Sequence, residues 1–310
     1  MVAWSYIFLA LIGQQSVGKI MIIDSHYHYE SRVQAVENLL EKMNQNGIDK
    51  TVLISPLNEL LPHTEEYLLK LLRFALWNKP LRWIARKLSS TFNEKGELVV
   101  QGNPVKIIFN PDNTPVAELI KQYPEKFLGW IFVNPNGSGD FMKEYENWKD
   151  TPGFIGVKTH PFWHRYAPID LSPVAEDLEK TGKPLLMHAG FGPEGDFIAL
   201  ADRFPNLKII LAHAGFPCFK DTWHQIKSYK NIYVDLAADA YVNEKVTLGV
   251  VDYLGKERVL YGTDGPYGNR LASDGVFDNG FLKRRLESLF PDKKTQALLL
   301  GENFLKIADL

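Results

Sequence analysis

Histidines and aspartates recur at the ends of apolar runs in this sequence, and both residue types bind divalent metal ions. His26 and His28 stand two apart in Asp-Ser-His-Tyr-His. Side chains two apart on a strand point to the same side, with Cα atoms about 7 Å apart, so this pair can share one ion. Asp24 has the same parity, and we expect its carboxylate to orient a histidine from one layer deeper.

Two further histidines and an aspartate end later apolar runs. His188 ends PLLMHAG, His213 ends KIILAHAG, and Asp264 ends VLYGTDGP. Taken singly, each has an ordinary structural explanation, because buried histidines are commonly hydrogen-bonded core residues and aspartates commonly cap turns. Together with His26 and His28 they place five residues with ligand chemistry at equivalent positions. This coincidence favours a metal site.

The elements that must position these residues are eight short apolar runs separated by helical patterns. The runs are KIMIIDSH, KTVLISP, FLGWIFVNP, FIGVKTHP, PLLMHAG, KIILAHAG, NIYVDLA and RVLYGTDG. Their ends lie 22 to 29 residues apart, except for an interval of 78 residues between Ser55 and Val133. The alternation predicts a parallel sheet, and eight strands predict a (β/α)₈ barrel rather than an open doubly wound sheet. Such barrels carry their sites at the carboxyl ends of the strands.

The long interval predicts an insertion at about residues 57–106, in the loop after the second strand, because one βα unit needs only about 30 residues. Residues 65–88 are basic, aromatic and amphipathic, and Pro80 divides them into two helices. We expect this inserted helical segment to be a lid over the barrel mouth. A contact between subunits is the second alternative, and a membrane surface is the third.

Composition and charge narrow the classes of function. The chain of 310 residues is 45% apolar with a net charge of −2, so it has no positive field to gather nucleic acid or an anionic membrane. Cys218 is the only cysteine, which excludes an internal disulfide and a cysteine-based zinc site. We expect a cytoplasmic protein with a single domain at residues 21–310. Residues 1–13 are apolar but too short to span a membrane, which takes about 20 residues, and we treat residues 1–20 as an N-terminal extension.

The order of the motifs resembles the amidohydrolase-related family. Asp-x-His-x-His in the first run, Gly-x-Lys-x-His-Pro in the fourth, two His-Ala-Gly ends and Gly-Thr-Asp carry the resemblance, which covers residues 21–310 and ends with GENFLKI. The branch includes aminocarboxymuconate-semialdehyde decarboxylase and related metal-dependent hydrolases. The resemblance implies one divalent ion, whose ligands would be His26, His28, His188 and Asp264. It also implies that His213 is the acid/base residue, and Asp264 could share that role.

Three imidazoles and one carboxylate suit Zn²⁺, with Mn²⁺ and Fe²⁺ as alternatives. Such an ion lowers the pKa of bound water to about 7 and polarises a substrate oxygen. We therefore expect hydrolysis of an ester, lactone or amide in a small carboxylate-bearing substrate. The alternative is nonoxidative decarboxylation of a small unsaturated or aromatic acid, which would use the same ligands. We expect the chain to bind a small-molecule substrate and not nucleic acid, and we do not expect it to bind a membrane. A homodimer is possible.

Three residues on or after the fourth run are candidates for substrate contact. Lys158 and His160 stand two apart and share a side, and Arg165 follows in the loop that would overhang the mouth. We expect Lys158 to be an uncarboxylated cation near a carboxylate or carbonyl of the substrate. A carboxylated lysine that bridges two metal ions, as in some superfamily members, is the second alternative, and a structural lysine is the third. Arg165 could pair with a carboxylate or be a solvated loop residue.

Overall fold

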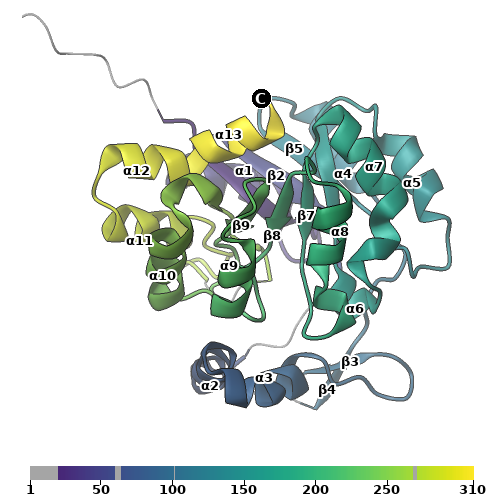
Figure 1. The fold of residues 1–310 in the computed structure, drawn as a ribbon. Coiled ribbons are helices and arrows are strands. Elements are labelled where there is room, and N and C mark those ends of the chain that lie inside the picture. The colour runs from purple at the N-terminus through teal and green to yellow at the C-terminus, as the bar shows by residue number, and fades with distance from the viewer. Residues whose placement is uncertain (1–19, 60–63, 101, 268–270) are drawn as a thin grey trace, which may run out of the picture.

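The computed structural model describes residues 20–59, 64–100, 102–267 and 271–310, so the predicted extension lies outside the described residues except for residue 20. All eight predicted strands are present and form one sheet in chain order (Figure 1). The strands of this sheet are β1 (Ile23–His28), β2 (Lys50–Ile54), β5 (Phe127–Phe132), β6 (Phe154–Thr159), β7 (Leu185–Met187), β8 (Ile209–Leu211), β9 (Ile232–Asp235) and β10 (Val259–Leu260). Neighbouring strands in this sheet pair in parallel.

The sheet curls until its last strand meets its first. The amide of Ser25 donates to the carbonyl of Tyr261 at 3.1 Å, and the amide of Asp264 donates to the carbonyl of His26 at 2.8 Å. Tyr27 and Gly265 form a parallel bridge farther along the same seam. These bonds join β1 to the segment that follows β10, which confirms the predicted (β/α)₈ barrel.

Helices follow the strands and surround the barrel (Figure 1). Outside the insertion they are α1 (Val36–Asn46), α4 (Thr114–Gln122), α5 (Phe141–Trp148), α6 (Pro161–His164), α7 (Ser172–Thr181), α8 (Phe197–Arg203), α9 (Lys220–Ile226), α10 (Glu244–Leu254), α11 (Phe281–Leu289), α12 (Lys293–Ala297) and α13 (Asn303–Ala308). Each long helix buries one apolar face against the sheet, as α1 does with Leu39 and Met43. None of the described helices is long and apolar enough to cross a membrane.

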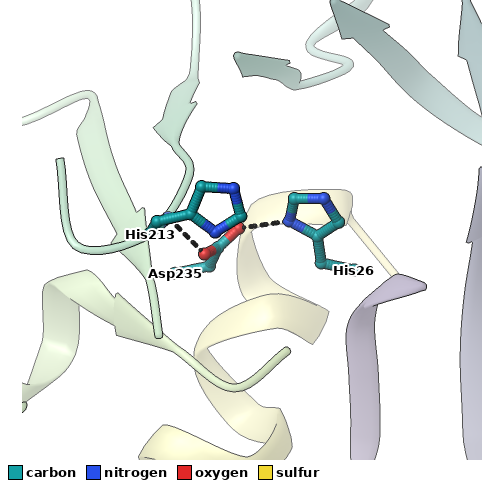
Figure 2. Close-up of side chains that lie close together, drawn as sticks. All are labelled: His26, His213 and Asp235. Carbon is teal, nitrogen blue, oxygen red and sulfur yellow. Dashed lines mark hydrogen bonds and ion pairs between the residues drawn. The ribbon is translucent and has the colours of Figure 1, made fainter. Parts of the chain in front are cut away.

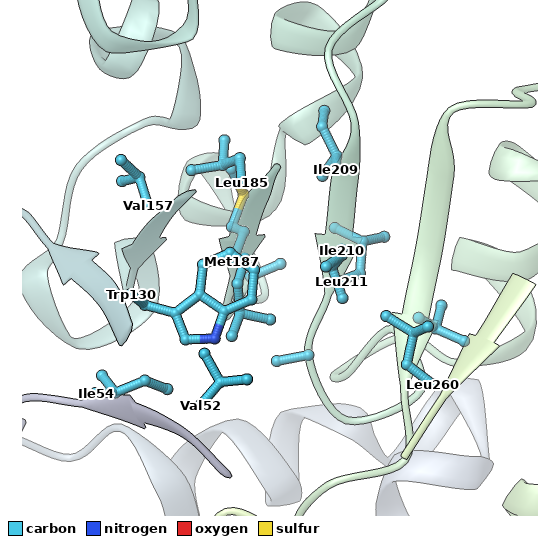
Figure 3. Packing of buried hydrophobic residues seen from close by; sticks show 14 of the residues in the cluster. Val52, Ile54, Trp130, Val157, Leu185, Met187, Ile209, Ile210, Leu211 and Leu260 are labelled. Carbon is cyan, nitrogen blue, oxygen red and sulfur yellow. The ribbon is translucent and has the colours of Figure 1, made fainter. Parts of the chain in front are cut away.

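The barrel interior is packed with apolar side chains from several strands. Figure 3 shows Trp130 of β5 among aliphatic side chains from β2, β6, β7 and β8. The indole nitrogen of Trp130 is fully buried and donates to the carbonyl of Ser25 on β1 at 2.9 Å. A buried indole needs such an acceptor, so this bond satisfies the indole N–H while the ring fills the core. The interior is therefore a closed core below the strand ends and not a channel.

The insertion contains the two predicted helices. They are α2 (Glu66–Trp77) and α3 (Arg82–Ser89), and a 3₁₀ turn at Lys79–Leu81 that contains Pro80 separates them. The structure adds an antiparallel hairpin of β3 (Leu98–Val100) and β4 (Asn103–Val105), which the periodicity did not predict because each strand is only three residues long.

The insertion lies at the end of the barrel to which the strands' carboxyl ends point (Figure 1). Arg73 donates to the carbonyls of Asp239 and Ala240 after β9. Arg82 binds the carboxylate of Asp221 after β8 at 2.6 Å. These contacts attach α2 to the segment after β9 and α3 to the first turn of α9, and the role of a lid remains a prediction.

Candidate metal centre

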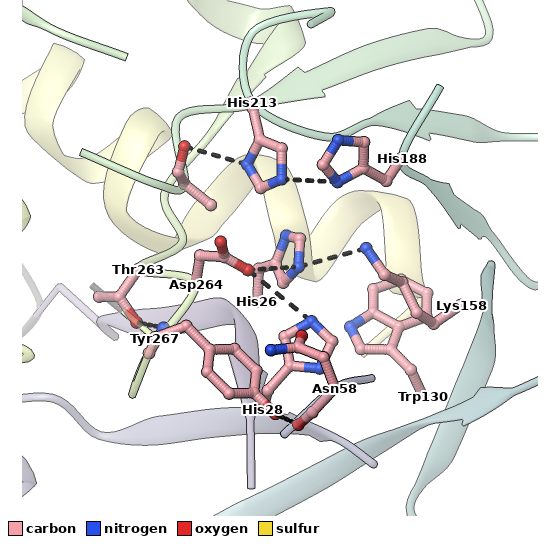
Figure 4. A network of polar contacts seen from close by, with 12 residues as sticks. His26, His28, Asn58, Trp130, Lys158, His188, His213, Thr263, Asp264 and Tyr267 are labelled. Carbon is pink, nitrogen blue, oxygen red and sulfur yellow. Dashed lines mark hydrogen bonds and ion pairs between the residues drawn. The ribbon is translucent and has the colours of Figure 1, made fainter. Parts of the chain in front are cut away.

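Two histidines and one aspartate meet where β1 and the segment after β10 leave the barrel. Nε2 of His26 lies 3.2 Å from Oδ1 of Asp264, and Nε2 of His28 lies 3.7 Å from the same oxygen. One ligand atom from each of the three residues lies within 4.8 Å of the others. Both histidines are buried, whereas the Asp264 side chain is 21% exposed. Figure 4 shows that the three side chains converge on one point.

The other ring nitrogen of each histidine is held by an acceptor. Nδ1 of His28 lies 3.0 Å from the carbonyl oxygen of Ser55, and a carbonyl oxygen only accepts, so Nδ1 carries the proton. Nδ1 of His26 lies 2.8 Å from Oδ2 of the buried Asp235 and donates in the same way. The remaining Nε2 of each ring is therefore unprotonated, and that of His26 lies within hydrogen-bonding distance of the Lys158 ammonium. Acceptors of this kind fix the tautomer and orientation of metal-binding histidines.

His188 and His213 form a second pair next to the first (Figure 4). Nδ1 of His213 lies 3.1 Å from the carbonyl oxygen of Ala237 and must donate to it. Nε2 of His213 is then an acceptor, and Nδ1 of His188 donates to it across 3.1 Å. Nε2 of His188 is left as a buried lone pair with no partner among the described residues. His213 stacks on His26 with ring centroids 5.3 Å apart, which places the second pair beside the first.

A second group of potential ligand atoms is a hydrogen-bond network rather than an ion site. His26, His213 and Asp235 also bring one ligand atom each within 4.8 Å of one another (Figure 2). However, Oδ2 of Asp235 accepts from the His26 ring, and Oδ1 accepts from the backbone amides of His213 and Ala237 at 2.7 and 3.0 Å. Both oxygens are already used, so Asp235 orients two histidine-bearing segments. The group around Asp264 is the better candidate for binding a metal ion.

Asp24 stabilises the backbone instead of a histidine ring. Its carboxylate accepts from the amide and hydroxyl of Thr263 at 2.9 and 2.6 Å and from the amide of His26 at 3.3 Å. The expectation that it orients a histidine ring is therefore wrong, because Asp235 approaches the His26 ring from β9. Thr263 precedes Asp264, so Asp24 holds β1 against the turn that presents the aspartate. Asp264 itself has a left-handed backbone, with φ 61°, which costs a non-glycine residue about 1 kcal/mol.

Lys158 reaches the same point from β6. Its side chain is fully buried, and its Nζ lies 3.2 Å from Nε2 of His26. Burial lowers the pKa of the Lys158 ammonium, while the nearby carboxylates of Asp264 and Asp235 act in the opposite direction. Burial likewise raises the pKa of Asp264, and the Lys158 charge opposes that shift. Each group moderates the desolvation of the other, as expected for opposite charges in a site with little water.

The histidines of the site are neutral rings. Burial lowers the pKa of His26, His28, His188 and His213 well below the ordinary value, and nearby cations add to the effect in each case. Burial also raises the pKa of Asp24 to about 7. Neutral imidazole is the form that binds metal ions, so the electrostatics of the site favour a ligand set over a cluster of charged histidines.

The other predicted contact residues separate into two groups. His160 is buried, and its ring centroid lies 4.0 Å from that of His188, which places it at the edge of the site. Its Nδ1 accepts from the amide of Trp163 and caps α6. Arg165 is exposed, and its guanidinium lies over the ring of Phe92 in the insertion, 4.5 Å from the centroid. The structure thus brings Lys158 and His160 to the site but places Arg165 against the insertion.

Asp235 is the residue that the sequence prediction left without a role. It ends NIYVDLA, the seventh run, at the position where Asp264 ends the eighth. That equivalence was the available signal. The two carboxylates nevertheless have different surroundings. The Asp235 carboxylate accepts from a histidine ring and from backbone amides, whereas the Asp264 carboxylate faces the unprotonated Nε2 atoms of His26 and His28.

Comparisons with known proteins concern the family and the fold of the chain. A family model described as amidohydrolase matches residues 93–307. The structure is similar to 5-carboxyvanillate decarboxylase from Sphingomonas paucimobilis, with a TM-score of 0.58, 15% identity and coverage of 94% of this chain and 99% of that one. It is also similar to a probable 2-pyrone-4,6-dicarboxylic acid hydrolase from Acinetobacter baumannii, with a TM-score of 0.59, 13% identity and coverage of 93% and 99%.

A third similar structure contains a metal ion. It is a 5-carboxyvanillate decarboxylase variant from Novosphingobium aromaticivorans with bound manganese, with a TM-score of 0.59, 16% identity and coverage of 94% of this chain and 98% of that one. At these identities the likeness concerns the fold. No curated protein matches the sequence significantly.

Proposed function

Because this chain belongs to the amidohydrolase family, we propose that it is a metal-dependent hydrolase of an ester, lactone or amide bond in a small carboxylate-bearing substrate. One divalent ion would be held by His26, His28, His188 and Asp264. The proposal rests on the state of the ring nitrogens: all three histidines donate through Nδ1, and all three keep an Nε2 lone pair. Three neutral imidazoles beside one carboxylate form a ligand set for a transition metal.

His26, His28 and Asp264 lie close enough together to fit such an ion, whereas His188, the fourth proposed ligand, does not belong to that group of atoms within 4.8 Å of one another. Nε2 of His188 is a buried acceptor without a partner among the described residues, and an unpaired buried polar atom is costly. Nε2 of His26 and Nε2 of His28 both face one oxygen of Asp264. Nitrogen-rich sites of this kind suit Zn²⁺ first, with Mn²⁺ or Fe²⁺ as alternatives. When bound, the ion would supply a positive charge that polarises a substrate oxygen and acidifies water.

Three residues of the chain would bind the substrate and transfer protons. Asp264 reaches the open side of the site, so its Oδ2 can accept the proton of an attacking water. The Lys158 ammonium would hold the carboxylate of the substrate, since it is the buried cation beside the ligand atoms. His213 holds His188 through its Nε2. We propose that it exchanges a proton at that atom only when His188 has moved away from it.

Decarboxylation is the second candidate function, and two observations favour it. Nζ of Lys158 lies 3.2 Å from Nε2 of His26, so a carboxylate bound to it would lie beside the proposed ligand atoms. Similar structures include decarboxylases of 5-carboxyvanillate and 2,6-dihydroxybenzoate as well as the pyrone dicarboxylic acid hydrolase. Under this alternative Lys158 and the ion would hold the acid, and a proton would replace the lost carboxyl group.

The first test is the metal content of protein purified without chelator, measured by plasma mass spectrometry. We expect about one divalent ion per chain, and its loss in the double variant His26→Ala/His188→Ala. A matched double variant, Lys230→Ala/Lys294→Ala, changes two exposed residues away from the site and should keep the ion. Two ions per chain would contradict the mononuclear centre and point to a carboxylated Lys158. No ion, and none taken up from Zn²⁺ or Mn²⁺, would contradict the whole proposal.

Product analysis on the metal-loaded protein separates the two reactions. Panels of lactones and aromatic carboxylic acids are incubated with the protein, and the products are identified by mass. Addition of one water supports hydrolysis. Release of carbon dioxide with a product one carbon shorter supports decarboxylation and would overturn the hydrolase proposal.

A further inference from the structure

A groove on the outside of the barrel lies between the insertion and two barrel helices. It encloses about 510 Å³ and is lined by Trp77 of α2, by residues of α9 and by residues of α10. In Figure 1 these three helices lie together on one flank of the molecule. The lining residues are Trp77, Lys220, Trp223, His224, Lys245, Gly249, Asp252 and Tyr253. None of them belongs to the candidate metal centre.

Two lysines converge on one aromatic ring in this groove. Nζ of Lys220 and Nζ of Lys245 each lie 4.4 Å from the ring centroid of Trp77. The two ammonium groups are therefore no farther apart than twice that distance. Each gains a favourable contact with the ring, but they repel each other. Within the described part of the chain neither forms an ion pair, and Asp252 is the single acidic residue of the lining.

Flat apolar surfaces form the rest of the groove. The rings of Trp77 and Trp223 meet edge to face at 6.2 Å, and the rings of Trp223 and Tyr253 lie 6.4 Å apart. Gly249 keeps the space between them open, since a Cβ there would lie 3.3 Å from Trp223 and 3.7 Å from Trp77. Trp223 itself is buried, so an aromatic ring could pack on the accessible parts of Trp77 and Tyr253 while an attached anion pairs with the lysines.

We infer that this groove is a second binding site, separate from the metal centre, for a small aromatic carboxylate. The carboxylate would pair with the exposed ammonium groups of Lys220 and Lys245, which form no ion pair among the described residues, and the ring would pack on the accessible parts of Trp77 and Tyr253. Because Trp77 belongs to the insertion and the lysines to the barrel helices, a bound ligand joins the two parts of the molecule. An inorganic anion would satisfy the lysines but would leave the aromatic walls unused.

Fluorine NMR of protein labelled with 5-fluorotryptophan reports on this groove directly. Substitution Trp77→Phe identifies the Trp77 resonance. Benzoate is expected to move the resonances of Trp77 and Trp223 to saturation. Acetate lacks the ring and benzyl alcohol lacks the charge, so each should bind at least about tenfold more weakly if charge and ring both contribute. The double variant Lys220→Gln/Lys245→Gln should weaken benzoate binding by a similar factor, whereas Lys220→Arg/Lys245→Arg should retain it.

Two further variants separate this site from the metal centre and from a general loss of structure. His26→Ala/His188→Ala should leave the benzoate response of Trp77 unchanged, so failure of the proposed function would not affect this result. Gly249→Leu fills the groove without removing charge and should abolish the response while circular dichroism stays the same. The inference is overturned if benzoate does not move the Trp77 resonance, if the glutamine variant binds as tightly as the natural chain, or if acetate binds as tightly as benzoate.

Discussion

The barrel mouth and the insertion both gather charged and aromatic residues, but they place them in opposite environments. At the mouth, Lys158, His26 and His28 are buried, and desolvation shifts their pKa values. In the insertion, Phe74 and Trp83 are 59% and 65% exposed. The mouth is held by backbone bonds between strands, whereas the insertion is attached largely through side chains such as Arg73 and Arg82.

This difference indicates where changes in sequence should affect chemistry and where they should affect stability. The sheet fixes the backbone of residues at strand ends, so polar side chains there can serve the chemistry of the site. Their burial removes them from water, which costs free energy. Residues of the insertion contribute to its docking, and changes there should leave the ligand atoms in place.

Loss of a ligand at the mouth should have the largest effect. For His28→Ala we expect loss of the bound ion and a fall in kcat/KM of about 10³-fold, since a bound ion contributes several kcal/mol to transition-state stabilisation. Metal analysis measures the bound ion, and steady-state kinetics measure kcat/KM with the substrate that the product analysis identifies. Phe74→Ala in the insertion is the matched change and should alter neither quantity. Equal losses in both variants would remove the distinction between the two regions.

Asp235→Asn should act through His26 with a smaller effect. Oδ1 of the amide can keep both backbone donors, so its NH₂ group faces Nδ1 of His26. The ring must then accept at Nδ1 and carry its proton on Nε2, which removes the lone pair that would bind the ion. We expect metal affinity to fall about 100-fold, measured by competition with a chelator. An unchanged affinity would show that Asp235 does not set the tautomer.

His164 joins the two regions and should make stability depend on pH. Its Nε2 donates to the carbonyl of Ile108 just beyond the insertion, and burial lowers its pKa from 6.5 to about 4. The folded protein therefore binds this proton less readily than the unfolded chain, so the contribution to stability is present above pH 6.5 and is lost as the pH falls toward 4. Between pH 8 and pH 5 the loss should be about 2 kcal/mol.

Urea unfolding of the natural chain and of His164→Gln at these two pH values isolates this contribution. The other buried histidines titrate in both proteins, so only the difference between the two curves reports on His164. We expect the stability advantage of the natural chain at pH 8 to shrink at pH 5. A constant difference would contradict the assignment.

The smallest effect is expected at the attachment of the insertion. Arg82→Ala removes the ion pair with Asp221 and a bond to the carbonyl of Cys218. The Arg82 side chain is 12% exposed and that of Asp221 is 41% exposed, so we expect a cost of about 1 kcal/mol and little change in kcat. Thermal denaturation and kinetics check this, with the exposed Arg86→Ala of the same helix as control. A large fall in kcat would instead favour the predicted role of a lid.

Much of the site follows from local features of the sequence. The His26 and His28 pair points to one side because alternation along a strand is a local property. The strand ends at His188, His213 and Asp264 could be located because apolar runs and the turns after them are also local. The eight runs and the two helices divided by Pro80 were predicted for the same reason.

The sequence by itself therefore determined the barrel and the residues at its mouth, and the tertiary structure decided which of them contact one another. Asp235 meets the ring of His26 across 209 positions of chain, and no periodicity encodes that pairing. The structure also placed His213 on His188, Arg165 on Phe92, and Lys220 and Lys245 on the ring of Trp77. Patterns along the chain specify which way a side chain points, but only closure of the barrel and docking of the insertion specify what it meets there.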